Sequence, residues 1–278
     1  MPKVTKQIAR PLKRVAKGVG VVDRILPVDE VPKKGLTVNV YGRSGTGKTT
    51  LACTFPKPLL LAGSEDGTQS VRNVDGVDFV MLTASSDLSV LTDYARDEGR
   101  YKTVVLDTLG GYYDLALKEV LGIEDLPATK SWGMAKREDW MQANTQVIER
   151  LKALMGLAVD GVNVVILAQE RDFTPEDRGD LLMPFVASAA TPGVVGWLNP
   201  ECNYLVQTFL RQKVTEQQKR VAGKTVTIRS KTEGVEYCIR TGPSPIYAVK
   251  FRLPKGTPLP DVIVDPSYQK IVNIVEGR

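Results

Sequence analysis

The residues best suited to chemistry in this sequence form one short glycine-rich segment. It follows the pattern G-x-x-x-x-G-K-[ST], in which glycines let backbone N–H groups converge on phosphate oxygens and the next helix adds its positive amino end. In that chemistry Lys48 bridges the β- and γ-phosphates of ATP, and the Thr49 hydroxyl binds Mg²⁺. The predicted ATP-binding residues are Gly42, Arg43, Ser44, Gly45, Thr46, Gly47, Lys48, Thr49 and Thr50. The alternative is a glycine-rich turn without a ligand.

A magnesium nucleotide also requires a carboxylate at a neighbouring strand end. The apolar run 103–106 leads directly into Asp107, where a predicted strand leaves the sheet. We therefore predict that Thr49 and Asp107 form the metal site. Many buried strands end in an aspartate that only caps the following helix, and this is the alternative for Asp107.

The attacking water needs a group that orients it, and the chain contains no histidine. A carboxylate is then the natural base. Glu65 and Asp66 follow the apolar run 59–62, one strand after the phosphate loop, so a parallel sheet would bring them to the edge where the γ-phosphate lies. We favour Glu65 over Asp66 as the catalytic carboxylate. In the alternative, both are solvated turn residues.

Another apolar run, 163–168, ends in Gln169 and Glu170. The Gln169 amide could hydrogen-bond the γ-phosphate or the attacking water and report the nucleotide state to the loop that follows, 171–193. Loops of this length in compact domains are usually functional or disordered. The alternative for Gln169 is an ordinary polar residue at a strand end.

Composition bounds the class of protein. With 278 residues, 42% of them hydrophobic, the chain can bury one large core with small appendages. The lack of histidine excludes Ser-His-Asp catalysis and histidine-ligated zinc. Cys53, Cys202 and Cys238 fit no metal spacing, which favours a reducing compartment. No apolar run approaches the roughly 20 residues of a membrane helix, so we expect a soluble, cytoplasmic protein without membrane contact.

The fold class follows from alternating strand and helix patterns. Strands are predicted at 36–41, 58–62, 79–82, 103–106 and 162–168, and helices near 48–55, 86–98, 109–121 and 138–158. This alternation predicts an α/β fold with a doubly wound, mostly parallel sheet, helices on both faces and ligands at the carboxyl ends of the strands. Four short strands at 204–210, 224–231, 235–241 and 247–253 predict C-terminal antiparallel hairpins, and a short helix is predicted at 268–275.

We divide the chain into a basic extension and linker at 1–34, an ATPase core at 35–255 with the hairpin region at 203–253, and a C-terminal tail with a short helix at 256–278. The extension has six basic residues before its first acidic residue, Asp23. It could be a flexible tail, a contact for nucleic-acid phosphates or a docking segment for a neighbouring subunit.

Basic residues are concentrated in the hairpin region, and the net charge of +5 with an isoelectric point near 9.0 suits a polyanionic partner. Basic grooves hold single-stranded nucleic acid together with aromatic rings that stack on bases. Phe173 and Phe185 are candidate rings, whereas Trp197 and Phe209 suit the core better. The predicted DNA-binding residues are Arg171, Arg211, Lys213, Lys219, Arg220, Lys224, Arg229 and Lys231. The alternative is a solvated charged surface.

Taken in order, these motifs resemble the phage-encoded RecA-like ATP-binding proteins, a family of RecA cores that includes single-strand annealing recombinases of the Sak type. The resemblance spans roughly 35–255 and rests on the segments 42–49, 60–67, 104–108, 131–133 and 165–170. It implies that Glu65 activates water and that Gln169 senses the γ-phosphate. The chain departs from the family at Gly63, where an acidic residue is common, and in having no histidine near Gln169.

RecA-like ATPases usually complete their sites across subunits, so the resemblance also implies a homo-oligomer, either a ring or a filament. Lys250 and Arg252, two apart on a predicted strand, point the same way. They resemble the finger with which such ATPases reach the neighbour's γ-phosphate, and by analogy with arginine fingers could accelerate turnover about 10³–10⁵-fold. The alternative is a basic strand that faces solvent.

Three functions are compatible with these residues. The leading hypothesis is an ATP-hydrolysing protein that acts on single-stranded DNA in phage-type recombination, annealing or repair, in the host cytoplasm. The second is a hexameric helicase or loader motor built on the same core. The third is a nucleotide-gated scaffold with little turnover.

Overall fold

The computed structural model describes residues 25–278 except 66, 68, 70, 128–134, 175–183 and 222–223, and it describes the side chains of neither 29 nor 214–232. The N-terminal part of the predicted extension, 1–24, and the motif 131–133 therefore lie outside the described residues.

One large sheet runs through the described part of the protein, with nine strands in the order β11-β9-β8-β1-β5-β4-β2-β3 and β10 beside β8. The six strands from β8 to β3 are parallel. β9 and β10 run antiparallel to β8, and β11 runs antiparallel to β9. The strands are β1 (Thr37–Gly42), β2 (Leu59–Gly63), β3 (Val77–Met81), β4 (Thr103–Asp107), β5 (Asn163–Ala168), β8 (Tyr204–Val221), β9 (Lys224–Arg240), β10 (Lys250–Phe251) and β11 (Val262–Val264), with a separate antiparallel pair, β6 (Glu170–Phe173) and β7 (Phe185–Ser188).

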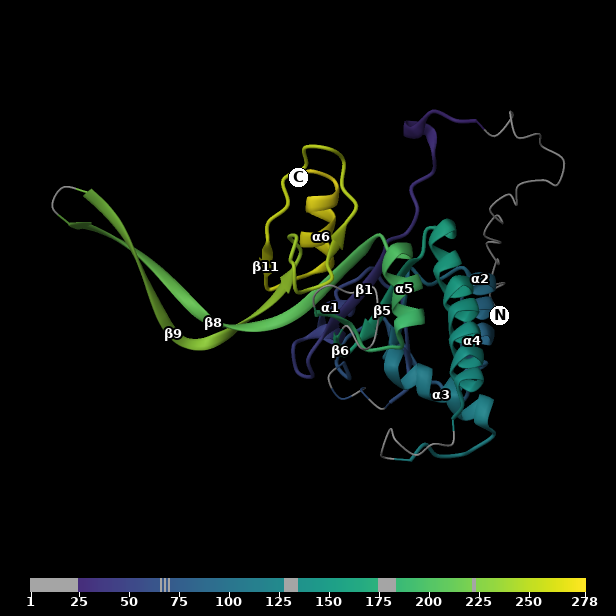
Figure 1. Ribbon diagram of the computed structural model, residues 1–278. Helices are drawn as coiled ribbons and strands as arrows, with labels where there is room; N and C mark the ends of the chain where they lie inside the picture. Colours follow the sequence, from purple (N-terminus) through teal and green to yellow (C-terminus); the bar gives the residue numbers. More distant parts are fainter. Residues whose placement is uncertain are drawn as a thin grey trace, which may run out of the picture.

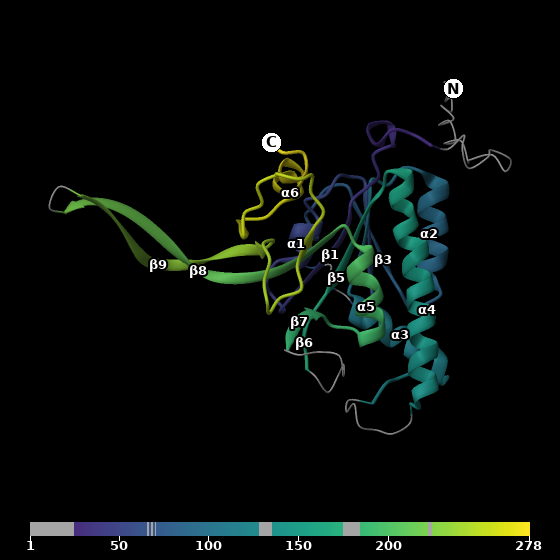
Figure 2. The same ribbon diagram turned by 45° about the horizontal axis from the view of Figure 1, so that its top comes forward.

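Helices cover both faces of the sheet (Figure 1 and Figure 2). The helices are α1 (Lys48–Ala52), α2 (Asp87–Glu98), α3 (Leu109–Leu121), α4 (Arg137–Met155), α5 (Pro192–Glu201) and α6 (Tyr268–Val275), with short 3-10 turns at Val28–Glu30 and Gly156–Asp160. Helices α2 to α5 pack on one face, and α1 and α6 pack on the other. Because side chains alternate along a strand, Leu60 and Ala62 of β2 face one core while Leu59 and Leu61 face the other.

The predicted fold class is confirmed: a mostly parallel α/β sheet with helices on both faces and antiparallel strands near the C-terminus. The five predicted strands before residue 170 match β1 to β5 within two residues. Strands of a parallel sheet are buried on both faces, so continuous apolar runs identify them in the sequence. The predicted helix at 268–275 coincides with α6, whose first turn is capped by the Ser267 side chain.

The short strands predicted at 204–210, 224–231 and 235–241 are wrong, whereas the strand predicted at 247–253 contains β10, which runs antiparallel to β8. Residues 204–240 form only two strands, β8 and β9, which pair from Gln207 and Arg240 out to Val221 and Lys224. A register shift between Gln212 and Val214 absorbs the extra residues near Gly234 without ending either strand. The prediction relied on apolar runs, whereas each of these strands continues through polar residues because its partner supplies the backbone hydrogen bonds.

Residues 211–236, which we call the arm, extend away from the body as a two-stranded ribbon (Figure 1). β1 pairs with β8 only as far as Thr208, and β11 pairs with β9 only from Cys238. At about 3.3 Å per residue the arm is roughly 35 Å long. It holds seven of the chain's 37 basic residues and three of its 32 acidic ones, which accounts for most of the net charge of +5.

The C-terminal residues 256–278, predicted as a tail, contribute a strand and a helix to the body. Ile271 of α6 is fully buried in the core beneath the sheet. The Tyr268 N–H donates to Thr54 Oγ1 at 2.8 Å, and the Tyr268 ring lies 4.9 Å from that of Phe55. These contacts fix α6 to the end of α1. Among the described residues, no helix has the length and apolar character needed to cross a membrane.

We predict that the arm is dispensable for folding. Gln212 and Val235 are paired across the two strands, so replacing 213–234 by Asn-Gly closes the ribbon with a two-residue turn. Since the backbone of the deleted strands pairs across the ribbon, the melting temperature should change by less than about 2 °C. Ile271→Ala is the control and should lower it by roughly 5–15 °C, as expected for a buried truncation. A large loss from the arm deletion would show that the arm packs on the body.

Candidate functional site

The phosphate loop lies between β1 and α1, at the carboxyl ends of the parallel strands. β5, β4 and β2 end at the same edge and bring Gln169, Asp107 and Glu65 beside it. A cavity of about 700 Å³ opens there, and Lys48, Thr49 and these three residues all line it. That volume is in the range of known small-molecule sites. The structure thus gathers five of the predicted site residues in one cavity: Lys48, Thr49, Glu65, Asp107 and Gln169.

Lys48 is buried at the base of this cavity, with 7% of its surface exposed. Gly47 precedes it with φ 85°, a left-handed conformation that favours glycine and that caps α1. The Lys48 ammonium donates to the carbonyl oxygens of Gly42 at 3.0 Å and Arg43 at 2.8 Å and to Gln169 Oε1 at 3.1 Å. Burial lowers the pKa of Lys48, while Asp107 and Glu170 oppose that shift. Phosphate oxygens would offer this ammonium a better partner than neutral carbonyls.

Thr49 and Asp107 form the predicted metal pair. The Thr49 hydroxyl donates to Asp107 Oδ2 at 2.8 Å. Burial raises the pKa of Asp107, and the bond from Thr49 and the charge of Lys48 oppose the rise. Two hard oxygen donors in contact fit Mg²⁺, which typically takes one or two protein oxygens and completes its shell with water and phosphate. Asp107 also precedes Thr108, and it is Thr108, not Asp107, whose side chain caps α3.

Glu65 is exposed and lies on the turn after β2. The Ser64 N–H donates to the Asp107 carbonyl at 2.8 Å, and the Thr108 N–H donates to Ser64 Oγ at 3.2 Å. These bonds tie the turn to the end of β4. A Cβ atom on Gly111 would lie 3.4 Å from Glu65 Oε1, so the carboxylate sits over the first turn of α3. Glu65 can therefore meet a water in the cavity, whereas Asp66 lies outside the described residues.

Gly63 is closely surrounded by neighbouring atoms. A Cβ atom on Gly63 would lie 2.7 Å from Cε2 of Phe79 on β3. An acidic side chain at this position would collide with the ring, so Phe79 and Gly63 occupy the space together.

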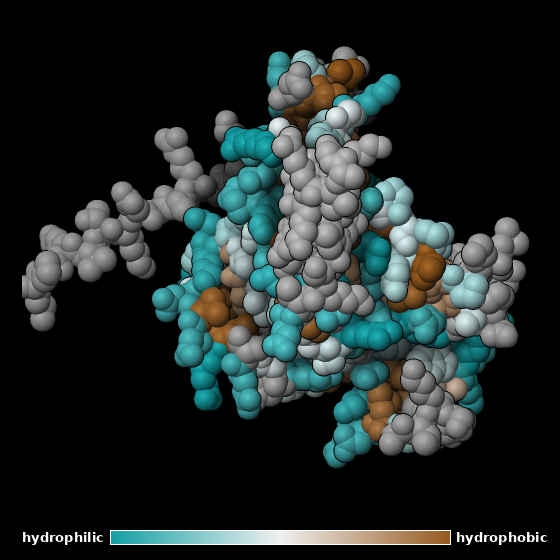
Figure 3. All heavy atoms as spheres, turned by 90° about the vertical axis from the view of Figure 1, so that its left-hand side faces the viewer, coloured by the Kyte–Doolittle hydropathy of each residue, from teal (hydrophilic) through white to brown (hydrophobic). Residues whose placement is uncertain are grey.

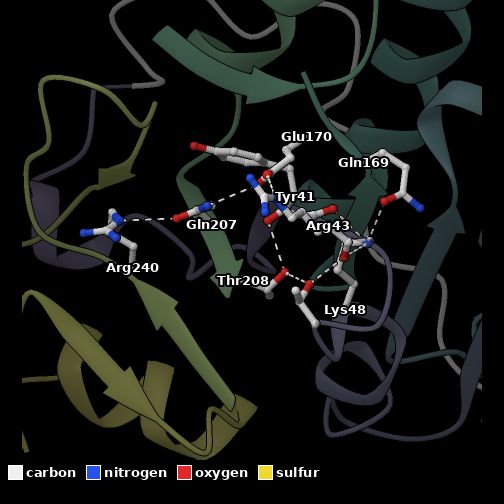
Figure 4. Close-up of polar contacts among 10 residues, drawn as sticks. Tyr41, Arg43, Lys48, Gln169, Glu170, Gln207, Thr208 and Arg240 are labelled. Carbon is white, nitrogen blue, oxygen red and sulfur yellow. Dashed lines mark hydrogen bonds and ion pairs between the residues drawn. The ribbon is translucent and has the colours of Figure 1, made fainter. Parts of the chain in front are cut away.

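Gln169 and its neighbour Glu170 connect the cavity to the base of the arm. Glu170 accepts hydrogen bonds from Arg43 Nε at 2.7 Å and from Gln207 Nε2 at 3.1 Å. Arg240 Nε donates to Gln207 Oε1 at 3.3 Å. Figure 4 shows this line of contacts running from the phosphate loop through β6 and β8 to β9.

Sequence reasoning missed these connecting residues. Glu170 follows Gln169 directly, but Gln207 and Arg240 lie on strands whose pairing only the fold reveals. The Arg240 guanidinium is also held over two rings, 5.0 Å from Phe209 and 4.6 Å from Tyr247. A second, smaller cavity of about 400 Å³ lies along this line.

Lys250 and Arg252 lie away from the phosphate loop of their own chain. β10 pairs with the start of β8, near Tyr204 and Leu205, whereas the phosphate loop follows the opposite end of β1. Both side chains donate to the Pro200 carbonyl, at 2.6 Å and 3.0 Å, so they point the same way, as predicted, and neutralise the carboxyl end of α5. Their predicted action on a neighbouring subunit stays a prediction.

The predicted DNA-binding residues are only partly described. Arg171 donates to the Ala190 carbonyl at 3.2 Å, and Arg211 pairs with Glu236 at 2.8 Å. Lys213 lies at the start of the arm. The side chains of Lys219, Arg220, Lys224, Arg229 and Lys231 lie outside the described ones.

The prediction that Phe173 could stack on a base is wrong. Phe173 is fully buried, and its ring stacks on that of Phe185 with centroids 5.0 Å apart. Phe209 lies against Arg240, and Trp197 packs on the main core, as predicted. The aromatic rings that the sequence offered for DNA are therefore engaged within the protein.

We predict that Asp107→Asn stabilises the ligand-free protein. The pKa of Asp107 is higher in the folded than in the unfolded protein. The free energy of unfolding therefore falls as pH rises from the unfolded pKa to the folded pKa. At neutral pH the ionised carboxylate thus destabilises the folded protein. Asparagine keeps an acceptor for Thr49 without that charge. At pH 7 the melting temperature should rise by ~2–4 °C, the equivalent of about 1 kcal/mol.

The difference should shrink as pH falls towards the ordinary pKa of an aspartate. Stabilisation by magnesium nucleotide should be lost in the same variant. An unchanged or lower melting temperature at pH 7 would show that the carboxylate stabilises the empty site.

Comparison with known families agrees with this geometry. A family model described as an AAA domain matches residues 34–244, which include the phosphate loop, Asp107, Gln169 and the arm. A search of curated proteins finds no match. Because the family model covers more than half of the 278 residues, the chain belongs to this AAA domain family of P-loop nucleoside triphosphatases, which bind and hydrolyse ATP.

Proposed function

We propose that this ATPase acts on single-stranded DNA in phage-type recombination, annealing or repair, as a homo-oligomer. The observation that carries the proposal is the line of contacts from the phosphate loop to Gln207 and Arg240, on the two strands that continue into the basic arm. A protein that only hydrolyses ATP has no need of that connection.

The chain's own residues supply most of the ATPase chemistry. Backbone N–H groups of 45–49 and the Lys48 ammonium would bind the phosphates. Thr49 and Asp107 would hold Mg²⁺, which when bound withdraws charge from the β- and γ-phosphate oxygens. Glu65 would orient the attacking water and accept its proton.

Nucleotide binding would also rearrange the contacts of Lys48. Its ammonium holds Gln169 in the ligand-free structure, and a γ-phosphate would compete for that ammonium. Gln169 would then turn towards the phosphate, and its neighbour Glu170 would shift against Arg43 and Gln207. The Arg43 side chain is 83% exposed, so its ion pair with Glu170 is weak and easily exchanged.

The arm suits a polyanionic partner. It holds most of the net positive charge, and an isolated two-stranded ribbon is only marginally stable in water, so a partner would stabilise it. Figure 3 views the protein from the arm side, where the described surface is mainly hydrophilic and the apolar residues form small separate groups. That surface favours a charged ligand over a large apolar one.

We predict that DNA stimulates ATP hydrolysis through the arm. A fourfold variant, with Lys219, Arg220, Lys224 and Arg229 changed to threonine, should bind single-stranded DNA roughly 10–100-fold more weakly at moderate salt and show a shallower salt dependence. Hydrolysis without DNA should be kept. Lys48→Ala should abolish hydrolysis in both conditions.

A matched control changes four basic residues on the helical side of the body to glutamine, and it should leave DNA binding intact: Lys118, Lys136, Arg137 and Lys152. Hydrolysis that ignores DNA in the wild type would instead favour the nucleotide-gated scaffold. Strand displacement by a closed ring would favour the helicase or loader.

We predict that active sites are shared between subunits. Glu65→Gln should lower turnover about 10²–10⁴-fold, and a Lys250→Ala, Arg252→Ala double variant by ~10³-fold. Mixing the two inactive proteins should restore part of the activity, because some interfaces then combine an intact Glu65 with an intact finger.

The melting temperature of the double variant must be measured first, because both cations cap α5. No recovery from two folded, mixed variants would rule out the finger, and an active Glu65→Gln with an inactive Asp66→Asn would transfer the catalytic role to Asp66.

A further inference from the structure

The cavity above the phosphate loop has a wall with no role in the chemistry described so far. Tyr237, Asp265 and Pro266 line it together with Thr50 and Leu51 of α1. They come from β9 and from the segment after β11, close to 200 residues beyond the loop. Phosphates bound by the backbone N–H groups of the loop and by Lys48 would leave this wall for the base and ribose.

Tyr237 lies directly against the phosphate loop. A Cβ atom on Gly47 would come within 3.1 Å of Tyr237 Cδ1, so the ring uses the space that the missing side chain leaves. The side chain is nevertheless 45% exposed. An aromatic ring that is half open to a ligand cavity, beside a phosphate-binding loop, offers a stacking surface to a base.

The wall is held at a fixed distance from the loop. The Asp265 N–H donates to the Tyr237 carbonyl at 2.8 Å, and β11 pairs with β9 just beyond it. On the other side, α6 is bound to the end of α1 through Tyr268 and Thr54. Because this stacking surface is already held in place, little conformational entropy is lost when a ligand binds to it.

Asp265 adds a hydrogen-bond acceptor to the wall. It is an exposed carboxylate with φ 46°, a left-handed conformation in which aspartate and asparagine are enriched among non-glycine residues. Adenine presents an amino donor where guanine presents a carbonyl acceptor, so a carboxylate facing that edge distinguishes the two bases.

We propose that Tyr237 stacks on the adenine of bound ATP and that Asp265 accepts a hydrogen bond from its amino group. This inference rests on the ATP site at Lys48 and adds to it a specificity wall made by the C-terminal part of the chain. The wall makes β9 and β11 part of the nucleotide site.

The test compares ATP with inorganic tripolyphosphate, both with Mg²⁺, by calorimetry on the full chain. Tyr237→Ala should weaken ATP about 5- to 100-fold, the range expected for loss of one stacked base, and leave tripolyphosphate unchanged. Tyr237→Phe should bind ATP within about threefold of wild type, because stacking needs only the ring. Tyr94→Ala is the matched control, since Tyr94 is also 45% exposed but lies on α2.

Tripolyphosphate binding by Tyr237→Ala also verifies that the variant is folded. Equal losses for ATP and tripolyphosphate, or no loss for either, would overturn the stacking role while leaving the phosphate site intact. A wild type that binds neither ligand would overturn the ATP site itself, and the wall with it.

Asp265→Gly tests the acceptor, because glycine adopts the left-handed backbone and removes the carboxylate. The variant should lose preference for ATP over GTP and over the purine triphosphate that lacks the amino group, by about tenfold. If it instead loses discrimination between ATP and 2′-deoxy-ATP, the carboxylate serves the ribose and the assignment to adenine is wrong.

Discussion

The position of Lys48 is the constraint on which the site depends. A buried ammonium needs oxygen partners, and the ligand-free protein supplies them from the Gly42 and Arg43 carbonyls and from Gln169. Two of these partners belong to the loop itself, so they hold the loop closed over its own lysine. The third, Gln169, lies between β5 and β6, so a ligand that replaces it at Lys48 would also affect β6. Bound phosphate oxygens would compete with all three of these partners for the Lys48 ammonium.

The body and the arm are stabilised by different interactions. The body buries apolar runs between two layers of helices, and this packing fixes the strand ends that carry Asp107 and Glu65. The described backbone of the arm pairs strand to strand, and its basic charge makes self-association unfavourable without a polyanion. A catalytic edge held by the core thus carries a basic ribbon, which under the proposed function would link nucleotide state to DNA.

Sequence alone predicted the parts of the site that follow strand ends. Thr49 and Asp107 could be paired in advance because parallel strands meet at one edge, and the 2.8 Å bond between them agrees. Tyr237 and Asp265 could not, because nothing in their local pattern signals a ligand and only the pairing of β9 with β8 and β11 brings them to the loop. The continuous arm was missed for a related reason, since a ribbon with polar residues has no apolar period to detect.

The two ends of the nucleotide converge on one strand in the proposed scheme. The γ-phosphate acts on β9 through a line of contacts that ends at Arg240. The line passes through Lys48, Gln169, Glu170 and Gln207. The base acts on the same strand three residues earlier, at Tyr237. Hydrolysis removes the first contact and leaves the second, because ADP keeps its base. β9 is also one strand of the arm, so the ATP and ADP states would differ at the base of the arm while the nucleotide stays bound.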